Sequence, residues 1–189
     1  METGVSAEAK PQAMTTRRRN PIPLAVLLAL GILPLAGRAP VPRKSPELMF
    51  LDPSGQQTLL SSFKGKVVLI EFLLTECPHC MRVTATINKL HRDLGPRGFQ
   101  PIGIAFEDGI SGPLVYYFAQ HFKVTFPVGY TSSDKVDSYL GRGRMERFQV
   151  PQIVVIDREG VIRAQSQPVD ETNLEDEKCL RRLIDTLLN

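Results

Sequence analysis

Two cysteines separated by two residues are the part of this sequence best suited to chemistry: Cys77-Pro78-His79-Cys80. They follow an apolar stretch at 66–74, and an amphipathic stretch with helical spacing begins at about Cys77. A thiolate is the nucleophile in disulfide exchange, and the N-terminus of a helix would favour that anion on Cys77. Pro78 suits the first helical turn, and His79 can donate a hydrogen bond or a positive charge beside the Cys77 sulfur. The pattern favours thiol–disulfide exchange.

The second cysteine, Cys80, lies one helical step after Cys77, so we expect it to be the more buried thiol. It would close a disulfide with Cys77 and release a mixed-disulfide partner. A zinc site is a second interpretation, but the other ligand types, Cys179, His91 and His121, are scattered over predicted helices. An inert structural disulfide is a third. The proline at a strand-to-helix junction favours the redox interpretation. We therefore expect no metal, and no cofactor beyond the redox-active Cys77–Cys80 disulfide.

A carboxyl group precedes the cysteines in the same apolar stretch. Glu71 lies six positions before Cys77, and its neighbours at 67–70 and 72–73 are all apolar. Burial raises the pKa of a carboxyl group, which would make Glu71 a proton acceptor for the Cys80 thiol. The alternative is that Glu71 sits at a solvated edge of the sheet.

A proline opens a later predicted strand. Pro151 follows Val150 and precedes the strand-like run at 152–157. A cis peptide bond is an option at such a position. It would leave the backbone N–H and C=O of Val150 exposed for pairing with an extended substrate. We therefore predict that Val150 and Pro151 bind substrate.

The elements that must position these residues alternate along the chain. Apolar runs predict strands at 48–51, 66–74, 99–106, 126–128, 152–157 and 161–164, the last two forming a hairpin. Helices are predicted from about 77 to the stop at 95–96, from 111, from 133 or 134 to 140, and after a capping box at 172–175. This alternation predicts an α/β fold with a central mixed sheet flanked by helices.

Helical spacing also predicts which side chains face the core. The expected inner positions are Val83, Ile87, Leu90 and Leu94 on the first helix, Leu114, Phe118 and Phe122 on the second, and Leu180, Leu183, Ile184, Leu187 and Leu188 on the last. Cys179 has apolar neighbours on the last helix, and we expect a packed thiol there.

The first quarter of the chain differs from the rest. Three arginines at 17–19 precede an uncharged apolar run, which is typical of an export signal. We predict an export signal or N-terminal membrane anchor at 1–37, a linker at 38–46, and one folded domain at 47–189. If uncleaved, residues 22–37 would hold the chain to a membrane. Whether this segment is removed is left open.

The charge balance excludes one class of partner. Of the formal net charge of +3, residues 1–46 carry seven positive and two negative side chains, or +5, which leaves −2 for the domain. A nucleic-acid-binding surface needs a basic patch on the folded domain, so we expect no nucleic-acid partner.

The combined motifs resemble the thioredoxin superfamily. The run at 71–80 with Val150-Pro151 downstream carries the resemblance, which covers about residues 46–165. FKGKVVLIEF at 63–72, FPV at 126–128 and VPQIVVIDREGVI at 150–162 are similar to membrane-anchored TlpA/ResA-type proteins of the bacterial envelope. The resemblance implies a thioredoxin-like fold with one extra βα unit between Cys77 and Pro151.

The dipeptide Pro78-His79 resembles the active site of DsbA-type oxidants, which also carry a glutamate six positions before the first cysteine. One departure is Glu76, which replaces the usual tryptophan and places a negative charge beside Cys77. Peroxiredoxins are distantly similar, but Thr75 lies two positions before Cys77 rather than three.

These observations predict a thiol:disulfide oxidoreductase of the bacterial cell envelope, on its extracytoplasmic (periplasmic) side, that exchanges a Cys77–Cys80 disulfide with protein substrates. Its partners would be protein thiols or disulfides and a redox partner protein. The His79 dipeptide favours an oxidant and the TlpA/ResA-like scaffold a reductant. The alternatives are a thiol-dependent peroxidase with antioxidant activity and a non-catalytic metal- or protein-binding module.

Overall fold

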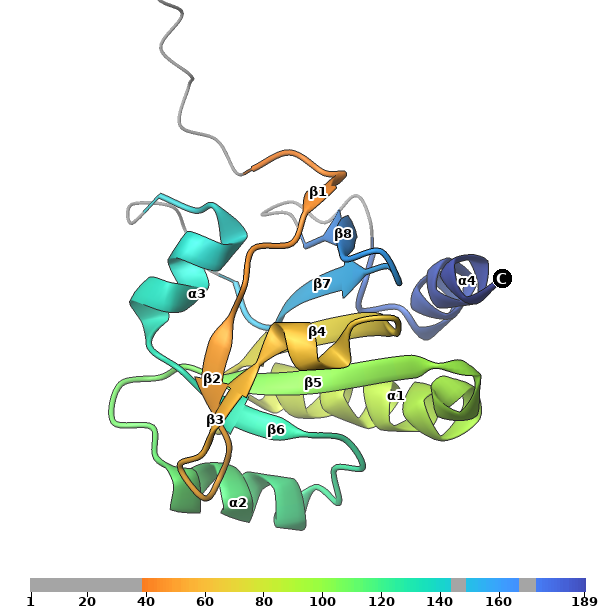
Figure 1. Cartoon of the computed structure of the whole chain (residues 1–189). Helices are drawn as coiled ribbons and strands as arrows, with labels where there is room; N and C mark the ends of the chain where they lie inside the picture. Colours follow the sequence, from red (N-terminus) through yellow and green to blue (C-terminus); the bar gives the residue numbers. More distant parts are fainter. Residues whose placement is uncertain (1–38, 144–148, 167–172) are drawn as a thin grey trace, which may run out of the picture. The chain divides into compact units, whose positions relative to one another are not determined.

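The computed structural model describes residues 39–143, 149–166 and 173–189. Its strands are β1 (Arg43–Lys44), β2 (Met49–Leu51), β3 (Gln57–Leu59), β4 (Val67–Leu73), β5 (Phe99–Ala105), β6 (Val128–Tyr130), β7 (Gln152–Ile156) and β8 (Val161–Gln165). Its helices are α1 (Pro78–Leu94), α2 (Gly112–His121), α3 (Ser133–Leu140) and α4 (Glu177–Leu188), with short 3-10 turns at Leu60–Phe63 and Gly95–Arg97 (Figure 1).

The strands form one mixed sheet in the order β1-β8-β7-β4-β5-β6-β2-β3. The central strand β4 runs parallel to β5 and antiparallel to β7. It is buried along its whole length, as its nearly continuous apolar sequence predicts. The hairpin predicted from the turn at 158–160 is confirmed by antiparallel pairing of β7 with β8. The central position of β4 carries the chain directly into the cysteine motif.

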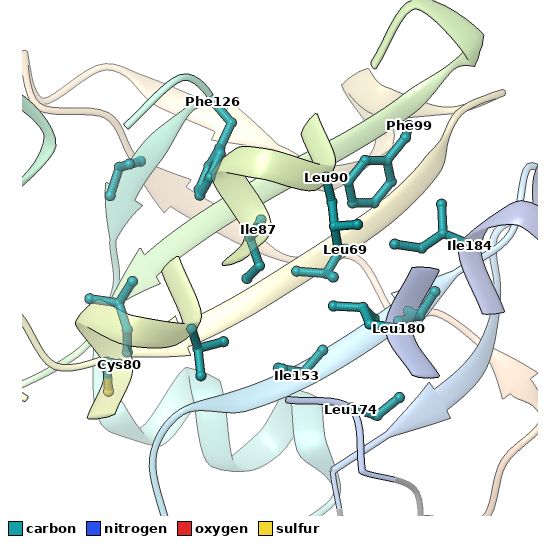
Figure 2. Close-up of a cluster of buried hydrophobic side chains, with 14 of the residues drawn as sticks. Leu69, Cys80, Ile87, Leu90, Phe99, Phe126, Ile153, Leu174, Leu180 and Ile184 are labelled. Carbon is teal, nitrogen blue, oxygen red and sulfur yellow. The ribbon is translucent and has the colours of Figure 1, made fainter. Parts of the chain in front are cut away.

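Helices cover both faces of the sheet. Alternate residues of β4 point to opposite faces, so Leu69 and Leu73 pack in one cluster while Ile70 and Phe72 pack in the other. The first cluster includes core residues of α1, α2 and α4, and Figure 2 shows Ile87, Leu90, Leu180 and Ile184 meeting there. The second cluster holds the buried residues of α3, namely Val136, Tyr139 and Leu140. The sheet is therefore the middle of three layers.

Three local predictions are wrong. Leu114 does not face the core, because its side chain is 49% exposed and Val115 is the buried residue. The third parallel strand begins at Val128 rather than at Phe126. The last helix does not use the predicted capping box, because the Asp176 side chain accepts from the Cys179 N–H and caps a helix that begins at Glu177.

The stretch predicted as a linker contributes to the sheet. Arg43 and Lys44 form β1 and pair with Ile162 and Val161 of β8. The Arg43 guanidinium also donates to the Tyr139 carbonyl at 3.1 Å, and this contact joins the strand to α3. The predicted export signal or anchor at 1–37 lies outside the described residues. Within the described ranges, none of the helices has both the length and the apolar composition needed to span a bilayer.

Candidate active site

The cysteine motif lies where β4 passes into α1. Cys77 caps the helix with an extended backbone, and its Sγ accepts the backbone N–H of Cys80 at 3.2 Å. Pro78 takes the first helical position, as its fixed φ and missing N–H suggest. Cys77 is half-buried and Cys80 is fully buried, so only the first sulfur is open to a partner. The free N–H groups at this helix end favour a negative charge on Cys77.

Cys80 is in the opposite environment. Burial raises the pKa of its thiol, and the hydrogen bond to the Cys77 sulfur raises that pKa further. Cys80 therefore keeps its proton at neutral pH until a nearby base accepts it. The two sulfurs are present as free thiols in this structure. The arrangement separates a half-buried first sulfur from a fully buried second sulfur.

Glu71 is a base in reach of this buried region. Its side chain is 0% exposed, which confirms the predicted burial and makes the solvated-edge alternative wrong. Alternation along β4 directs it to the α1 face, where the Thr84 hydroxyl lies 2.9 Å from Oε2 and 3.1 Å from Oε1. Burial raises the pKa of Glu71 to about 8. The hydrogen bond from Thr84 lowers this pKa, and the negative charge of Glu175 raises it. Such a group can exchange protons with a thiol near neutral pH.

The His79 imidazole pairs with a carboxylate from a distant segment. Its Nε2 lies 2.7 Å from Oε2 of Glu175, in the segment just before α4, and the two side chains are 44% and 32% exposed. In the sequence, Glu175 ends the predicted capping box at 172–175, and that pattern gives no sign of the contact with His79. Ninety-six positions separate the two residues, so no local pattern could have joined them.

A second missed residue holds the turn before Cys77. Glu107, which follows β5, accepts the Thr75 backbone N–H at Oε1 over 2.9 Å and also accepts the Thr75 hydroxyl. Thr75 lies two residues before Cys77, so this contact fixes the path of the chain into the motif. Thr84 was missed as well, although its spacing of four from Cys80 places it on the buried stripe of the helix.

The predicted substrate-binding pair lies beside the cysteines. The Val150–Pro151 peptide bond is cis, as the sequence allowed. The register pairs Gln152 with Phe72 near the end of β4, which brings the start of β7 next to the turn that leads to Cys77. Val150 and Cys77 pack against the same apolar cluster. The Gln152 amide donates to the Gln149 carbonyl at 2.6 Å and so holds this loop.

No group of three or more histidine, cysteine, aspartate or glutamate side chains that could hold a metal ion occurs in the described part of the chain. The side chains that the structure brings together here are two thiols, a buried carboxyl group and an imidazole. This set can transfer electrons by sulfur exchange and move protons without another bound group.

A family model described as Redoxin matches residues 39–184. The chain belongs to the redoxin family. A curated relative, the thiol-disulfide oxidoreductase ResA of Geobacillus thermodenitrificans, is 26% identical over 121 residues. That match covers 63% of this chain and 64% of the relative, so the similarity spans somewhat less than two thirds of the relative's length.

Solved structures share the architecture of this redoxin. A thiol:disulfide interchange protein of the thioredoxin family from Chlorobium tepidum is 20% identical with a TM-score of 0.63, covering 80% of this chain and 99% of its own. A thiol:disulfide interchange protein from Bacteroides sp. is 22% identical with a TM-score of 0.63, and the match covers 78% of this chain and 90% of that protein. The predicted thioredoxin-like α/β fold is therefore confirmed, with β5, α2, β6 and α3 between the active-site helix and β7.

Proposed function

We propose that this redoxin is a thiol:disulfide oxidoreductase whose Cys77–Cys80 pair exchanges with protein substrates. The observation that carries the proposal is the pair of unequal sulfurs at the start of α1. Cys77 is half-exposed at the helix N-terminus, and Cys80 is buried behind it with its N–H bonded to the Cys77 sulfur at 3.2 Å. Membership of the redoxin family and the likeness to a ResA protein support the same chemistry.

The exchange proceeds in two steps when the dithiol meets a substrate disulfide. The Cys77 thiolate attacks one substrate sulfur, forms a mixed disulfide, and releases the other substrate sulfur as a thiolate. Cys80 then loses its proton and attacks the Cys77 sulfur. The Cys77–Cys80 disulfide forms, and the second substrate sulfur leaves and takes up a proton. Two electrons pass to the substrate, and a dithiol partner protein restores the starting state. With oxidised Cys77–Cys80 and a substrate dithiol, every step runs in reverse.

Glu71 is the proton acceptor for the second step. It lies on the α1 face of β4, and its negative charge raises the pKa of the buried Cys80 thiol. A pKa of about 8 places its proton affinity between that of an ordinary carboxyl and a buried thiol. The backbone of Val150, before the cis Pro151, is the surface on which an extended substrate pairs beside Cys77.

The proposed setting is the bacterial cell envelope. The basic residues at 17–19 followed by the apolar run at 22–36 support export or anchoring of the domain. Protein thiols and disulfides outside the cytoplasm are then its substrates, and the extracytoplasmic space allows disulfides to persist. Fractionation of cells that carry the tagged full chain tests this part, with the expected signal in the envelope and not in the cytosol.

Turnover of a disulfide-linked model peptide by a small dithiol tests the chemistry. We expect the wild-type chain to accelerate reduction, and Cys77→Ser to abolish the acceleration. Cys179→Ser is the matched control, because Cys179 lies on α4 with its sulfur accepting from Arg182 at 3.3 Å, and it should retain full turnover. Rapid formation of a Cys77 sulfenate with hydrogen peroxide, without peptide turnover, would instead identify a peroxidase.

A further inference from the structure

The direction of electron flow depends on the charges around Cys77. A positive charge beside Cys77 stabilises its thiolate, which stabilises the dithiol form and makes the couple more oxidising. His79 is the imidazole in the motif, two residues after Cys77. Its Nε2 lies 2.7 Å from a carboxylate oxygen of Glu175, so a counter-charge accompanies any positive charge on the ring.

The Glu175 carboxylate is held in place by the fold. Its neighbour Leu174 is buried in the same cluster as Cys80, and Figure 2 shows both side chains in that cluster. Asp176 follows and caps α4. Glu175 therefore sits on a short anchored segment between a core residue and a helix cap.

Two further ion pairs align α4 with α1. Lys89 of α1 pairs with Glu177 of α4 at 2.7 Å, and Asp93 of α1 pairs with Arg181 of α4 at 2.5 Å. These contacts lie about two to four turns beyond Cys80 along α1. They help to fix α4 against α1, and with it the position of Glu175 beside His79.

The sign of the effect follows from a charge count. With Glu175 present, the pair carries no net charge when the imidazole is protonated and −1 when it is neutral. With a neutral side chain at position 175, the corresponding values are +1 and 0. The effect on Cys77 passes through the protonated imidazole, whose positive charge the carboxylate neutralises, because the Glu175 side chain by itself is 32% exposed and its charge is screened by water. Glu175 also acts on the buried carboxyl of Glu71, whose pKa it raises. The exposed Glu76 adds negative charge next to Cys77, and Arg82, which donates to the Pro78 carbonyl, adds positive charge on the same helix.

We propose that Glu175 is a positioning residue that pairs with His79 and shifts the Cys77–Cys80 couple toward the reducing side. This inference rests on the proposed function and decides its direction. The chain then passes two electrons from its Cys77–Cys80 dithiol to a substrate disulfide, which leaves as a dithiol. A protein dithiol partner reduces the chain again. The DsbA-like dipeptide is thus present without the free imidazole that would make the site an oxidant.

The test is a redox titration of the full chain against glutathione at neutral pH, with Glu175→Gln beside the wild type. We expect the variant to be at least tenfold easier to reduce, which is about 30 mV for a two-electron couple. It should also reduce a disulfide peptide more slowly and oxidise a dithiol peptide faster. Glu159→Gln is the control, because it removes one exposed carboxylate in the turn between β7 and β8, away from the cysteines, and should leave the equilibrium constant within twofold of wild type.

The same Glu175→Gln change made in a His79→Gln variant shows whether the shift in the redox equilibrium passes through the imidazole. In His79→Gln, the change caused by Glu175→Gln should shrink at least threefold. A shift below threefold in the wild-type background, a shift toward easier oxidation, or an undiminished effect in His79→Gln would overturn the inference while leaving the proposed function intact. Absence of any reversible Cys77–Cys80 couple in the wild type would remove both.

Discussion

Replacing Glu71 with glutamine changes how the stability of the fold depends on pH. Glutamine has nearly the same shape and can accept the Thr84 hydroxyl, but it has no proton to lose. In the folded chain Glu71 is 0% exposed, and burial raises its pKa from an ordinary value of 4.5 to about 8. Between these two values the unfolded carboxyl is ionised while the folded one still holds its proton.

The sign of the pH dependence follows from proton binding. The folded state binds more protons than the unfolded state in this window, so the free energy of unfolding falls as pH rises. Each pH unit inside this window lowers the free energy of unfolding by about 1.4 kcal/mol. From roughly pH 5 to roughly pH 7 the wild type therefore loses about 3 kcal/mol that Glu71→Gln does not lose. Above the folded pKa of about 8, the two curves run parallel.

The assay is urea unfolding of the reduced chains across this pH range, followed by circular dichroism. We expect the difference in unfolding free energy, variant minus wild type, to grow in favour of the variant by about 3 kcal/mol between roughly pH 5 and roughly pH 7. Glu177→Gln is a control with a half-exposed carboxylate, and its curve should follow the wild type. Parallel curves for Glu71→Gln and wild type would refute a neutral buried carboxyl at this position.

The remaining predictions concern proton transfer and packing. The rate at which Cys80 resolves a mixed disulfide should rise with pH through about 8, because the Glu71 carboxylate forms there. Glu71→Gln should resolve the mixed disulfide about 100-fold more slowly and without that rise. Quenched-flow measurement of the resolution rate checks both expectations. Ile87→Ala leaves a cavity at a fully buried position and should lower the free energy of unfolding by about 2–5 kcal/mol. Leu114 is exposed, so Leu114→Ala should lower it by less than about 0.5 kcal/mol. Equal losses for the two variants would contradict the assignment of these side chains to the core and the surface. Gly129→Ala would push a methyl group into the Phe50 ring and should lower Tm by several degrees, which calorimetry can check.

Local patterns in the sequence were sufficient for the central strand and the helix that carries the cysteines. The apolar run at 67–73 predicts a strand buried on both faces, and a lone carboxyl in such a run predicts a buried Glu71. Proline and cysteine spacing correctly placed Cys77 at the start of α1. These properties depend on neighbours in the chain, and a single sequence contains them.

Properties that depend on distant contacts were missed. Helix α2 has apolar or aromatic residues on more than one face, so its spacing could not distinguish exposed Leu114 from buried Val115. The pairing of His79 with Glu175 joins two segments 96 positions apart, and the contact of Thr75 with Glu107 joins segments 32 positions apart. Only the three-dimensional fold brings these groups together.

Trapping of the mixed disulfide tests the central claim most directly. Cys80→Ser removes the resolving thiol but leaves Cys77 half-exposed at the start of α1. When this variant is mixed with a disulfide-linked peptide and mapped by mass spectrometry, we expect a stable peptide adduct on Cys77. Wild type and Cys77→Ser should accumulate none. An adduct on Cys179, or no adduct on Cys77 at all, would contradict the account.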